Sequence, residues 1–168
     1  MVVLALSQTT GYAIQALACL TIEGESKYVR DLAADAKVPA AYLSKIVQRL
    51  NRAGILISRR GYLGGVQLAR PANAITLLEI CEAVDGPLYL GGCLLGLETC
   101  TDERACPTHA FWTVTRAKIR ETLGKITLAG VAEFEAKRQT VSLSLAEWKP
   151  RVSRKRSARK PARKATRK

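Results

Sequence analysis

Residues 29–53 read VRDLAADAKVPAAYLSKIVQRLNRA, and this stretch decides the fold. Apolar residues recur at helical spacing in its first part and predict a short helix over residues 29–36. Pro39 suits the first position of a second helix, because proline lacks the backbone N–H that has no partner there. We expect that second helix to run to Ala53. Two helices joined by a tight turn predict a helix-turn-helix unit.

The helix expected over residues 39–53 has one apolar face and one polar, basic face. The residues of the apolar face are Leu43, Ile46, Val47 and Leu50. In a helix-turn-helix, the second helix enters the major groove of DNA, where its polar side chains reach base edges and phosphates. The opposite face is therefore expected to contact DNA, and it carries Tyr42, Ser44, Lys45, Gln48, Arg49 and Arg52.

The residues that follow predict a β-hairpin with a glycine-rich tip. The strand-prone segments ILISRR (55–60) and VQLAR (66–70) enclose the turn residues GYLGG. A hairpin directly after a helix-turn-helix is a wing. On this wing, Arg59, Arg60 and Arg70 suit contacts to phosphates or to the minor groove.

A further helix is expected at the start of the chain. Ser7 is a suitable N-cap for it, and the helix should end before Gly24. Cys19 in this helix, like Cys81 further on, falls on an apolar face, and we expect both cysteines to be buried as small hydrophobic residues. The buried stripe of the helix is expected to be Tyr12, Ala13, Ala16, Leu17 and Leu20.

Three cysteines and the one histidine of the chain fall within 17 residues, at Cys93, Cys100, Cys106 and His109. The gaps between the cysteines are longer than the C-x₂₋₄-C spacing of common structural zinc sites. Three thiolates and an imidazole suit a 2Fe–2S cluster of raised potential, in which imidazole replaces sulfur. Zinc, a thiol switch without metal, and cysteines that only fill space stay open as alternatives.

A longer helix is expected from Thr108 to about Leu123, and a short closing helix from Leu128 to Ala136. Most helix-turn-helix regulators pair two half-sites, so an interface helix between two subunits is expected. We expect dimer contacts from one side of the longer helix, which carries Phe111, Trp112, Thr115, Ile119 and Leu123.

Several motifs occur in an order that resembles the IscR/NsrR/CymR family (Rrf family) of bacterial regulators. The resemblance covers roughly residues 5–138. Its motifs are VPAAYLSKI (38–46), RRGYLGG (59–65), ITLLEI (75–80), AVDG (83–86), and Cys93…Cys100…Cys106 followed by PTHAFW (107–112). The resemblance implies a winged-helix homodimer that binds a pseudo-palindromic operator. In members with three cysteines it also implies an iron–sulfur cluster that tunes DNA binding.

The resemblance also bears on the type of cluster. Some relatives bind a 4Fe–4S cluster with a carboxylate from the first helix of the partner subunit as the fourth ligand. This chain has Gln8 and Tyr12 in that region, and no acidic residue before Glu23. This difference favours His109 as the fourth ligand, and a 2Fe–2S cluster over a 4Fe–4S cluster.

The net charge of +13 is concentrated at the end of the chain. Residues 149–168 hold 11 of the 27 lysines and arginines and no acidic residue, so 16 basic and 14 acidic residues leave the remainder at +2. The last residues have no apolar periodicity and are expected to be disordered, with nonspecific contacts to DNA phosphates.

The expected organisation is a mainly α-helical chain in four parts. These are a winged helix-turn-helix domain with a small β-hairpin wing (1–86), a cysteine-containing cluster loop (87–107), C-terminal dimerisation helices (108–138), and a linker with a disordered basic tail (139–168). Because 48% of the residues are hydrophobic, the chain is expected to form a folded core.

The sequence predicts a DNA-binding transcriptional regulator whose operator binding is controlled by an iron–sulfur cluster that senses redox state, nitric oxide or iron–sulfur status. The alternative is a nucleic-acid-binding protein with zinc or free thiols in the loop. An enzyme is not expected, because there is one histidine, no P-loop and no dinucleotide fingerprint. No apolar run is long enough to span a membrane, and no positively charged segment precedes the first apolar run, so we expect a cytoplasmic protein with reduced thiols.

Overall fold

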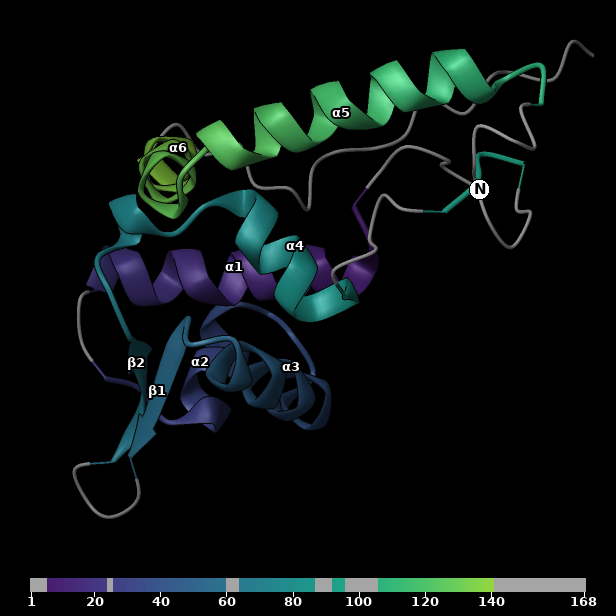
Figure 1. Ribbon diagram of the computed structural model, residues 1–168. Coiled ribbons are helices and arrows are strands. Elements are labelled where there is room, and N and C mark those ends of the chain that lie inside the picture. Colours follow the sequence, from purple (N-terminus) through teal and green to yellow (C-terminus); the bar gives the residue numbers. More distant parts are fainter. Residues whose placement is uncertain (1–5, 24–25, 60–63, 87–91, 96–105, 141–168) are drawn as a thin grey trace, which may run out of the picture.

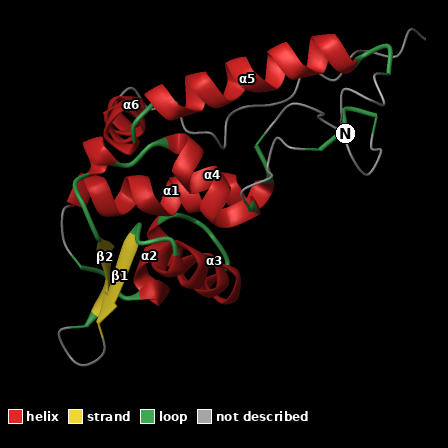
Figure 2. Cartoon of the chain, in the orientation of Figure 1, coloured by secondary structure: helices red, strands yellow, loops and turns green. Residues whose placement is uncertain are grey.

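The computed structural model describes residues 6–23, 26–59, 64–86, 92–95 and 106–140. Arg60, Cys100 and the basic tail, all singled out by the sequence, lie outside the described residues. The described part is mainly helical, with a two-stranded antiparallel sheet, which confirms the expected fold class (Figure 2). Its elements are α1 (Gln8–Glu23), α2 (Val29–Asp35), α3 (Ala40–Arg52), β1 (Leu56–Arg59), β2 (Gly65–Leu68), the 3₁₀ helix η1 (Ala72–Ala74), α4 (Leu77–Asp85), α5 (His109–Lys125) and α6 (Leu128–Thr140).

Helix α1 lies at the centre of the molecule. It contacts α2, α3, α4, α6 and β2. In Figure 1, α2, α3 and the wing lie on one side of α1, and α5 and α6 lie on the other. Ser7 caps the helix as expected, because its Oγ accepts a hydrogen bond of 3.0 Å from the backbone N–H of Thr10.

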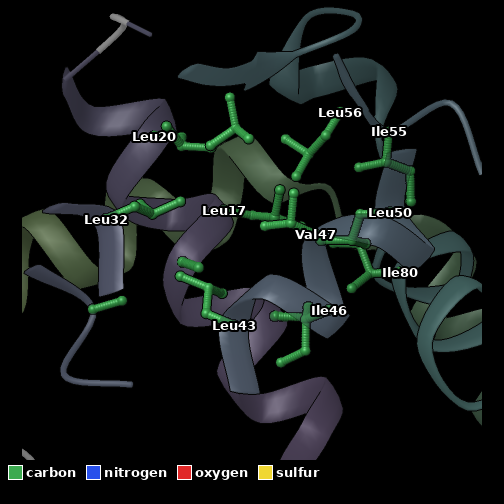
Figure 3. Close-up of a cluster of buried hydrophobic side chains, with 14 of the residues drawn as sticks. Leu17, Leu20, Leu32, Leu43, Ile46, Val47, Leu50, Ile55, Leu56 and Ile80 are labelled. Carbon is green, nitrogen blue, oxygen red and sulfur yellow. The ribbon is translucent and has the colours of Figure 1, made fainter. Parts of the chain in front are cut away.

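The core forms where the apolar faces of these helices meet the base of the wing. Figure 3 shows Leu17 and Leu20 of α1 beside leucine and isoleucine side chains from α2, α3, α4 and the first strand. All four residues predicted for the apolar face of α3 are buried. In α1 the inner residues are buried too, while Tyr12 is only partly buried against the core. Burial of apolar area of this kind is the main favourable term in folding.

The turn between α2 and α3 has the geometry of a Schellman motif. The N–H groups of Lys37 and Val38 donate to Ala34 O at 3.1 Å and Ala33 O at 2.9 Å. Lys37 has a φ of 54°, a left-handed conformation that glycine adopts more easily. Pro39 is the N-cap of α3 rather than its first helical residue, so the sequence placed this boundary within one residue.

The wing is anchored by a residue that the sequence did not point to. β1 and β2 pair in the register Leu56↔Leu68 to Arg59↔Gly65, as a hairpin. Lys27, before α2, pairs with Val66 from the other side: its N–H donates to Val66 O at 3.1 Å, and Val66 N–H donates to Lys27 O at 2.7 Å. These two bonds hold β2 against the segment that leads into the helix-turn-helix.

Arg70 has a different role from the one expected. It follows β2, and its guanidinium donates to Ala74 O and to Glu79 Oε1, both at 2.7 Å. Glu79 is also part of a capping box with Thr76 at the start of α4. Burial raises the pKa of Glu79, but hydrogen bonds from Thr76 and Arg70 outweigh this and hold it below its usual value. Arg70 therefore ties the end of the wing to α4.

Helices α5 and α6 differ in how closely they pack on the core. Leu128, at the start of α6, is fully buried, and its N–H donates to Ile75 O at 2.8 Å. Helix α5 reaches beyond the α1–α4 body in Figure 1 and is tied to α4 by an ion pair of 2.7 Å between Arg120 and Glu82. Among the described helices, none is long and apolar enough to cross a membrane.

The stripe predicted on α5 is divided between two environments. Trp112 is buried, and its indole N–H donates to Gly92 O at 2.7 Å, while Leu123 packs against the core. Phe111 is 62% exposed, and its neighbour one turn on, Val114, is 71% exposed. Trp112 and Leu123 thus contact their own chain, whereas Phe111 and Val114 face outward.

Position 65 is expected to require glycine, because the backbone of Lys27 approaches it closely. Its φ is +141°, and an added Cβ would lie 2.6 Å from Lys27 O. We predict that Gly65→Ala lowers the free energy of unfolding by about 2 kcal/mol, through backbone strain and steric overlap. The matched control is Gly11→Ala inside α1, where a Cβ would meet nothing within 4 Å. Alanine there should stabilise the protein by roughly 0.5–1 kcal/mol.

Urea unfolding of both variants, followed by circular dichroism, checks this prediction. A Gly65→Ala midpoint equal to that of the wild type would show that the close approach of Lys27 does not constrain the wing.

Candidate nucleic-acid interface and cysteine segment

The outer face of α3 presents polar and basic side chains to solvent. Lys45, Gln48 and Arg52 are exposed, and within the described part of the chain we find no hydrogen bond or ion pair from their side chains. The Ser44 hydroxyl, also exposed, donates to Ala40 O within the helix at 2.9 Å. Helix α3 contains no acidic residue, so this face is positive and suits the phosphates of DNA.

Tyr42, in the first turn of α3, is held by α1. Its hydroxyl lies 2.6 Å from the Oγ1 of Thr9. Its ring meets that of Tyr12 edge to face, with centroids 5.7 Å apart and an interplanar angle of 82°. The Tyr12 hydroxyl in turn accepts a hydrogen bond of 2.9 Å from Gln8. Tyr42 remains 39% exposed. Its contacts with Thr9 and Tyr12 therefore hold a surface side chain in one orientation.

Two further side chains connect α3 to neighbouring elements. The Arg49 guanidinium donates to the backbone carbonyl of Val84, near the end of α4. Asn51 donates through Nδ2 to the Ser58 hydroxyl on β1 at 2.7 Å. The sequence suggested neither contact. The partner of Arg49 is a main-chain atom 35 residues away, and Asn51 bonds to a side chain on a different element.

The wing contributes one described basic residue to the same candidate surface. Arg59 is the last residue of β1, is exposed, and pairs with Gly65 of β2. Ile57, two residues earlier, is 41% exposed. Arg59 therefore lies at the far end of the hairpin, where a wing contacts the DNA backbone or the minor groove.

The structure describes two of the three predicted cysteine ligands, Cys93 and Cys106. Cys93 and Cys106 are free thiols of intermediate exposure. The pKa of Cys106 is lowered by hydrogen bonds from the side chain and backbone of Thr108, whose Oγ1 lies 3.2 Å from Sγ, and also by the thiol of Cys93. A thiolate is the form of cysteine that binds metal, so the two thiols fit part of the donor set of an iron–sulfur cluster.

His109 lies at the start of α5, directly beside this pair. Its backbone N–H donates to Cys106 O at 2.9 Å, and its Nε2 is 3.5 Å from the hydroxyl of Thr113. Among the residues that the structure describes, no group of three or more metal-binding side chains is assembled. Cys100 falls outside those residues, so three of the four predicted ligands can be placed.

The remaining cysteines are in the predicted apolar surroundings. Cys81 is fully buried in α4, and burial together with the negative charge of Asp85 raises its pKa to about 11. Cys19 is partly buried and packs against the core. A buried thiol of raised pKa stays protonated at neutral pH, so Cys81 is unsuited to bind a metal ion.

Both ends of the cysteine segment are attached to the helical body. At one end, Asp85 closes α4, and its carboxylate accepts hydrogen bonds of 2.8 Å from the hydroxyls of Ser7 and Thr10. Thr10 is fully buried. The other end leads into α5, and the indole N–H of Trp112 in that helix donates to the carbonyl of Gly92, the residue before Cys93. The segment is therefore connected to the first turn of α1, which also carries the partners of Tyr42.

Comparisons with known proteins agree on the family. The model of the Rrf2 family, described as an iron-dependent transcriptional regulator, matches residues 6–133. The regulator IscR of Xenorhabdus nematophila is 31% identical over 119 residues, which cover 70% of this chain and 72% of IscR. The solved structure of T. potens IscR has a TM-score of 0.63 at 25% identity and covers 81% of this chain and 91% of its own.

The structure of CymR, the global cysteine regulator of B. subtilis, has a TM-score of 0.65 at 23% identity. It covers 78% of this chain and 98% of CymR, and it supports the fold alone. The family match extends from α1 into α6 and so includes the helix-turn-helix, the wing and the cysteine segment. This chain belongs to the Rrf2 family of DNA-binding transcriptional regulators and is not an enzyme.

Proposed function

We propose that this protein is a homodimeric, sequence-specific regulator whose operator binding responds to an iron–sulfur cluster held by Cys93, Cys100, Cys106 and His109. The observation that carries the proposal is the geometry at the start of α5, where the backbone N–H of His109 donates to Cys106 O and the Thr108 hydroxyl lies 3.2 Å from the Cys106 sulfur. A 2Fe–2S cluster is favoured over 4Fe–4S. A protein with this role acts in the cytoplasm, where its operator lies.

The proposed DNA surface is formed by the outer face of α3 and the wing. Base edges and nearby phosphates are contacted from α3, and phosphates or the minor groove from Arg59 and Arg60. The absence of acidic residues from α3 and the exposure of its polar face support this assignment. The residues proposed for contact on α3 are Tyr42, Ser44, Lys45, Gln48 and Arg52.

The proposed homodimer places α5 between the two subunits. A pseudo-palindromic operator is read by two copies of the helix-turn-helix, held at a fixed separation. Phe111 and Val114 leave large apolar side chains uncovered one turn apart on α5, and a second copy of the helix would bury them. Phe111 belongs to the predicted stripe and stays available after Trp112 and Leu123 have packed on their own chain, whereas Val114 was not predicted to take part.

Within the proposed site, the three thiolates and the imidazole bind the cluster, and Thr108 stabilises the thiolate of Cys106 by hydrogen bonding. A cluster with an imidazole ligand supplies a redox-active centre whose potential depends on its ligands. The chain's own contribution is to attach the two ends of the segment to neighbouring helices: Asp85 before it bonds to Ser7 and Thr10, and α5 after it is tied to α4 by the Arg120–Glu82 ion pair. Redox state, nitric oxide and the supply of iron–sulfur clusters are the candidate signals.

A second candidate function is a thiol-based regulator without iron. The lowered pKa of Cys106, to which the thiol of Cys93 contributes, also favours thiol chemistry, because the thiolate is the reactive form. Protein purified without oxygen distinguishes the two candidates. Colour, iron and inorganic sulfide support the cluster, whereas a colourless protein with free thiols or zinc supports the alternative.

Substitution of single cysteines tests the proposed ligands. Replacing Cys93, Cys100 or Cys106 by alanine is expected to abolish retention of iron and sulfide, because a cluster with three thiolate ligands cannot lose one and remain bound. Cys81→Ala is the matched control and should keep the colour. His109→Ala should shift the absorption spectrum and weaken retention without abolishing it. Full iron occupancy in Cys100→Ala protein would contradict this ligand set.

Substitutions on α3 and the wing test the DNA surface. A bidentate contact to a base contributes about 1–3 kcal/mol of discrimination. Gln48→Ala is therefore expected to change which operator sequences are preferred, as measured by binding to a randomised DNA pool. Arg59→Ala should weaken binding to all sequences alike. If neither substitution changes DNA affinity, the surface lies elsewhere on the protein.

The basic tail is proposed to add nonspecific contacts with phosphates. Each phosphate neutralised adds roughly 0.9 to the slope of log affinity against log salt concentration. If four or so of the 11 tail charges engage DNA, deletion of residues 149–168 should reduce that slope by about 3–4 units while operator preference is kept. An unchanged slope in the truncated protein would assign the tail to another partner or to solubility.

A further inference from the structure

The polar side chains of α3 fall into two groups. Tyr42, Arg49 and Asn51 are bonded to other elements of the domain, namely α1, α4 and β1. Lys45 and Gln48 make no such bond within the described residues. We propose that Arg49 is a positioning residue, which holds the recognition helix against α4 rather than contacting DNA. This inference rests on the proposed use of α3 to read the operator.

The geometry of an α-helix separates the two groups. With 3.6 residues per turn, Lys45, Gln48 and Arg52 project directly opposite the buried stripe of α3. Arg49 lies two turns after Tyr42, and both project along one edge of that stripe. Asn51 projects along the other edge. The bonded side chains therefore hold α3 at both edges, and the unbonded ones point straight away from the domain.

The partner of Arg49 is a group that needs a donor. Val84 lies in the last turn of α4, where backbone carbonyls have no partner within the helix. Among the described residues, the last backbone bond of that helix runs from Gly86 N–H to Glu82 O, and no backbone N–H of this part of the chain donates to the Val84 carbonyl. The guanidinium of Arg49 donates to it. A cation at the C-terminus of a helix also interacts favourably with the helix dipole.

The bond to Val84 has a consequence for DNA reading. Base contacts require side chains to be held within a few tenths of an ångström of their productive positions. The bond from Arg49 to Val84 and the bond from Tyr42 to Thr9 together oppose rotation of α3 about its axis and movement away from α1 and α4. Loss of the Arg49 bond should therefore weaken operator binding even though no contact with DNA is removed.

A pair of matched substitutions separates a positioning role from a phosphate contact. Arg49→Met and Arg52→Met each remove one positive charge from the last turn of α3. Arg52→Met is expected to reduce the salt slope of DNA affinity by roughly 0.9 and to leave the melting temperature unchanged. Arg49→Met is expected to leave the slope unchanged, to lower operator affinity roughly tenfold, and to lower the melting temperature.

The opposite result would overturn the proposal. If Arg49→Met reduces the salt slope as Arg52→Met does and melts like the wild type, Arg49 contacts a phosphate. Arg49→Lys provides a second test that keeps the charge. Because lysine can still bind a phosphate but lacks the guanidinium that reaches Val84, a positioning role predicts weakened operator binding with an unchanged slope. Wild-type affinity and melting temperature in Arg49→Lys would contradict it.

Failure of the proposed DNA surface would look different. In that case Gln48→Ala and Arg52→Met would both leave DNA binding unchanged, so α3 would not be the reading helix. The melting temperature of Arg49→Met, measured without DNA, would still report whether the bond to Val84 holds α3 and α4 together.

Discussion

Burial of α1 along most of its length is the constraint on which the other elements depend. Ala13 and Leu17 are fully inaccessible to solvent, and Ala16 and Leu20 nearly so. The small alanine side chains let neighbouring helices approach closely, and the leucines fill the space between them. Helices α2 and α3 pack on one side of α1, and α6 packs on the other. The DNA-binding unit and α6 therefore share one central element rather than forming separate bodies.

Polar contacts at the ends of the helices add precision to this arrangement. Apolar packing is tolerant of small rotations, whereas a hydrogen bond requires a defined direction. The first turn of α1 bonds to both α3 and α4, through Thr9 to Tyr42 and through Thr10 to Asp85. Arg49 joins α3 to α4 directly. Each of α1, α3 and α4 is thus hydrogen-bonded to the other two, so a movement of one of these helices would strain its bonds to both others.

This set of contacts lies where the cysteine segment leaves the helical body. Asp85 is the last residue of α4 before that segment, and Cys106 and His109 stand at its far end, on the first turn of α5. A change in the segment would act on Asp85 and on α5, and both are bonded to helices of the DNA-binding unit. Helix α4 itself packs against both α1 and α3.

Much of the fold could be read from the sequence, because helix periodicity, caps and turn residues are local properties. Ser7 and the apolar residues of α3 predicted a helix cap and a buried face that the structure confirms, and Pro39 placed the start of α3 within one residue. The pattern also predicted helix α5, but it did not show that Trp112 and Leu123 of its apolar stripe pack on their own chain. The pattern alone could not tell whether Trp112 packs on its own chain or on another, since both environments exclude water.

What the sequence by itself determined is the winged helix-turn-helix, its family and the set of candidate ligands, because these are written in local spacing. Only the tertiary structure decided which candidate residues have partners. Arg49 and Arg70 look like DNA contacts in the sequence, yet one bonds to Val84 and the other to Glu79. Likewise Cys93 helps to lower the pKa of Cys106 although 13 positions separate them in the sequence. Long-range contacts of this kind depend on how helices pack, which no local pattern records.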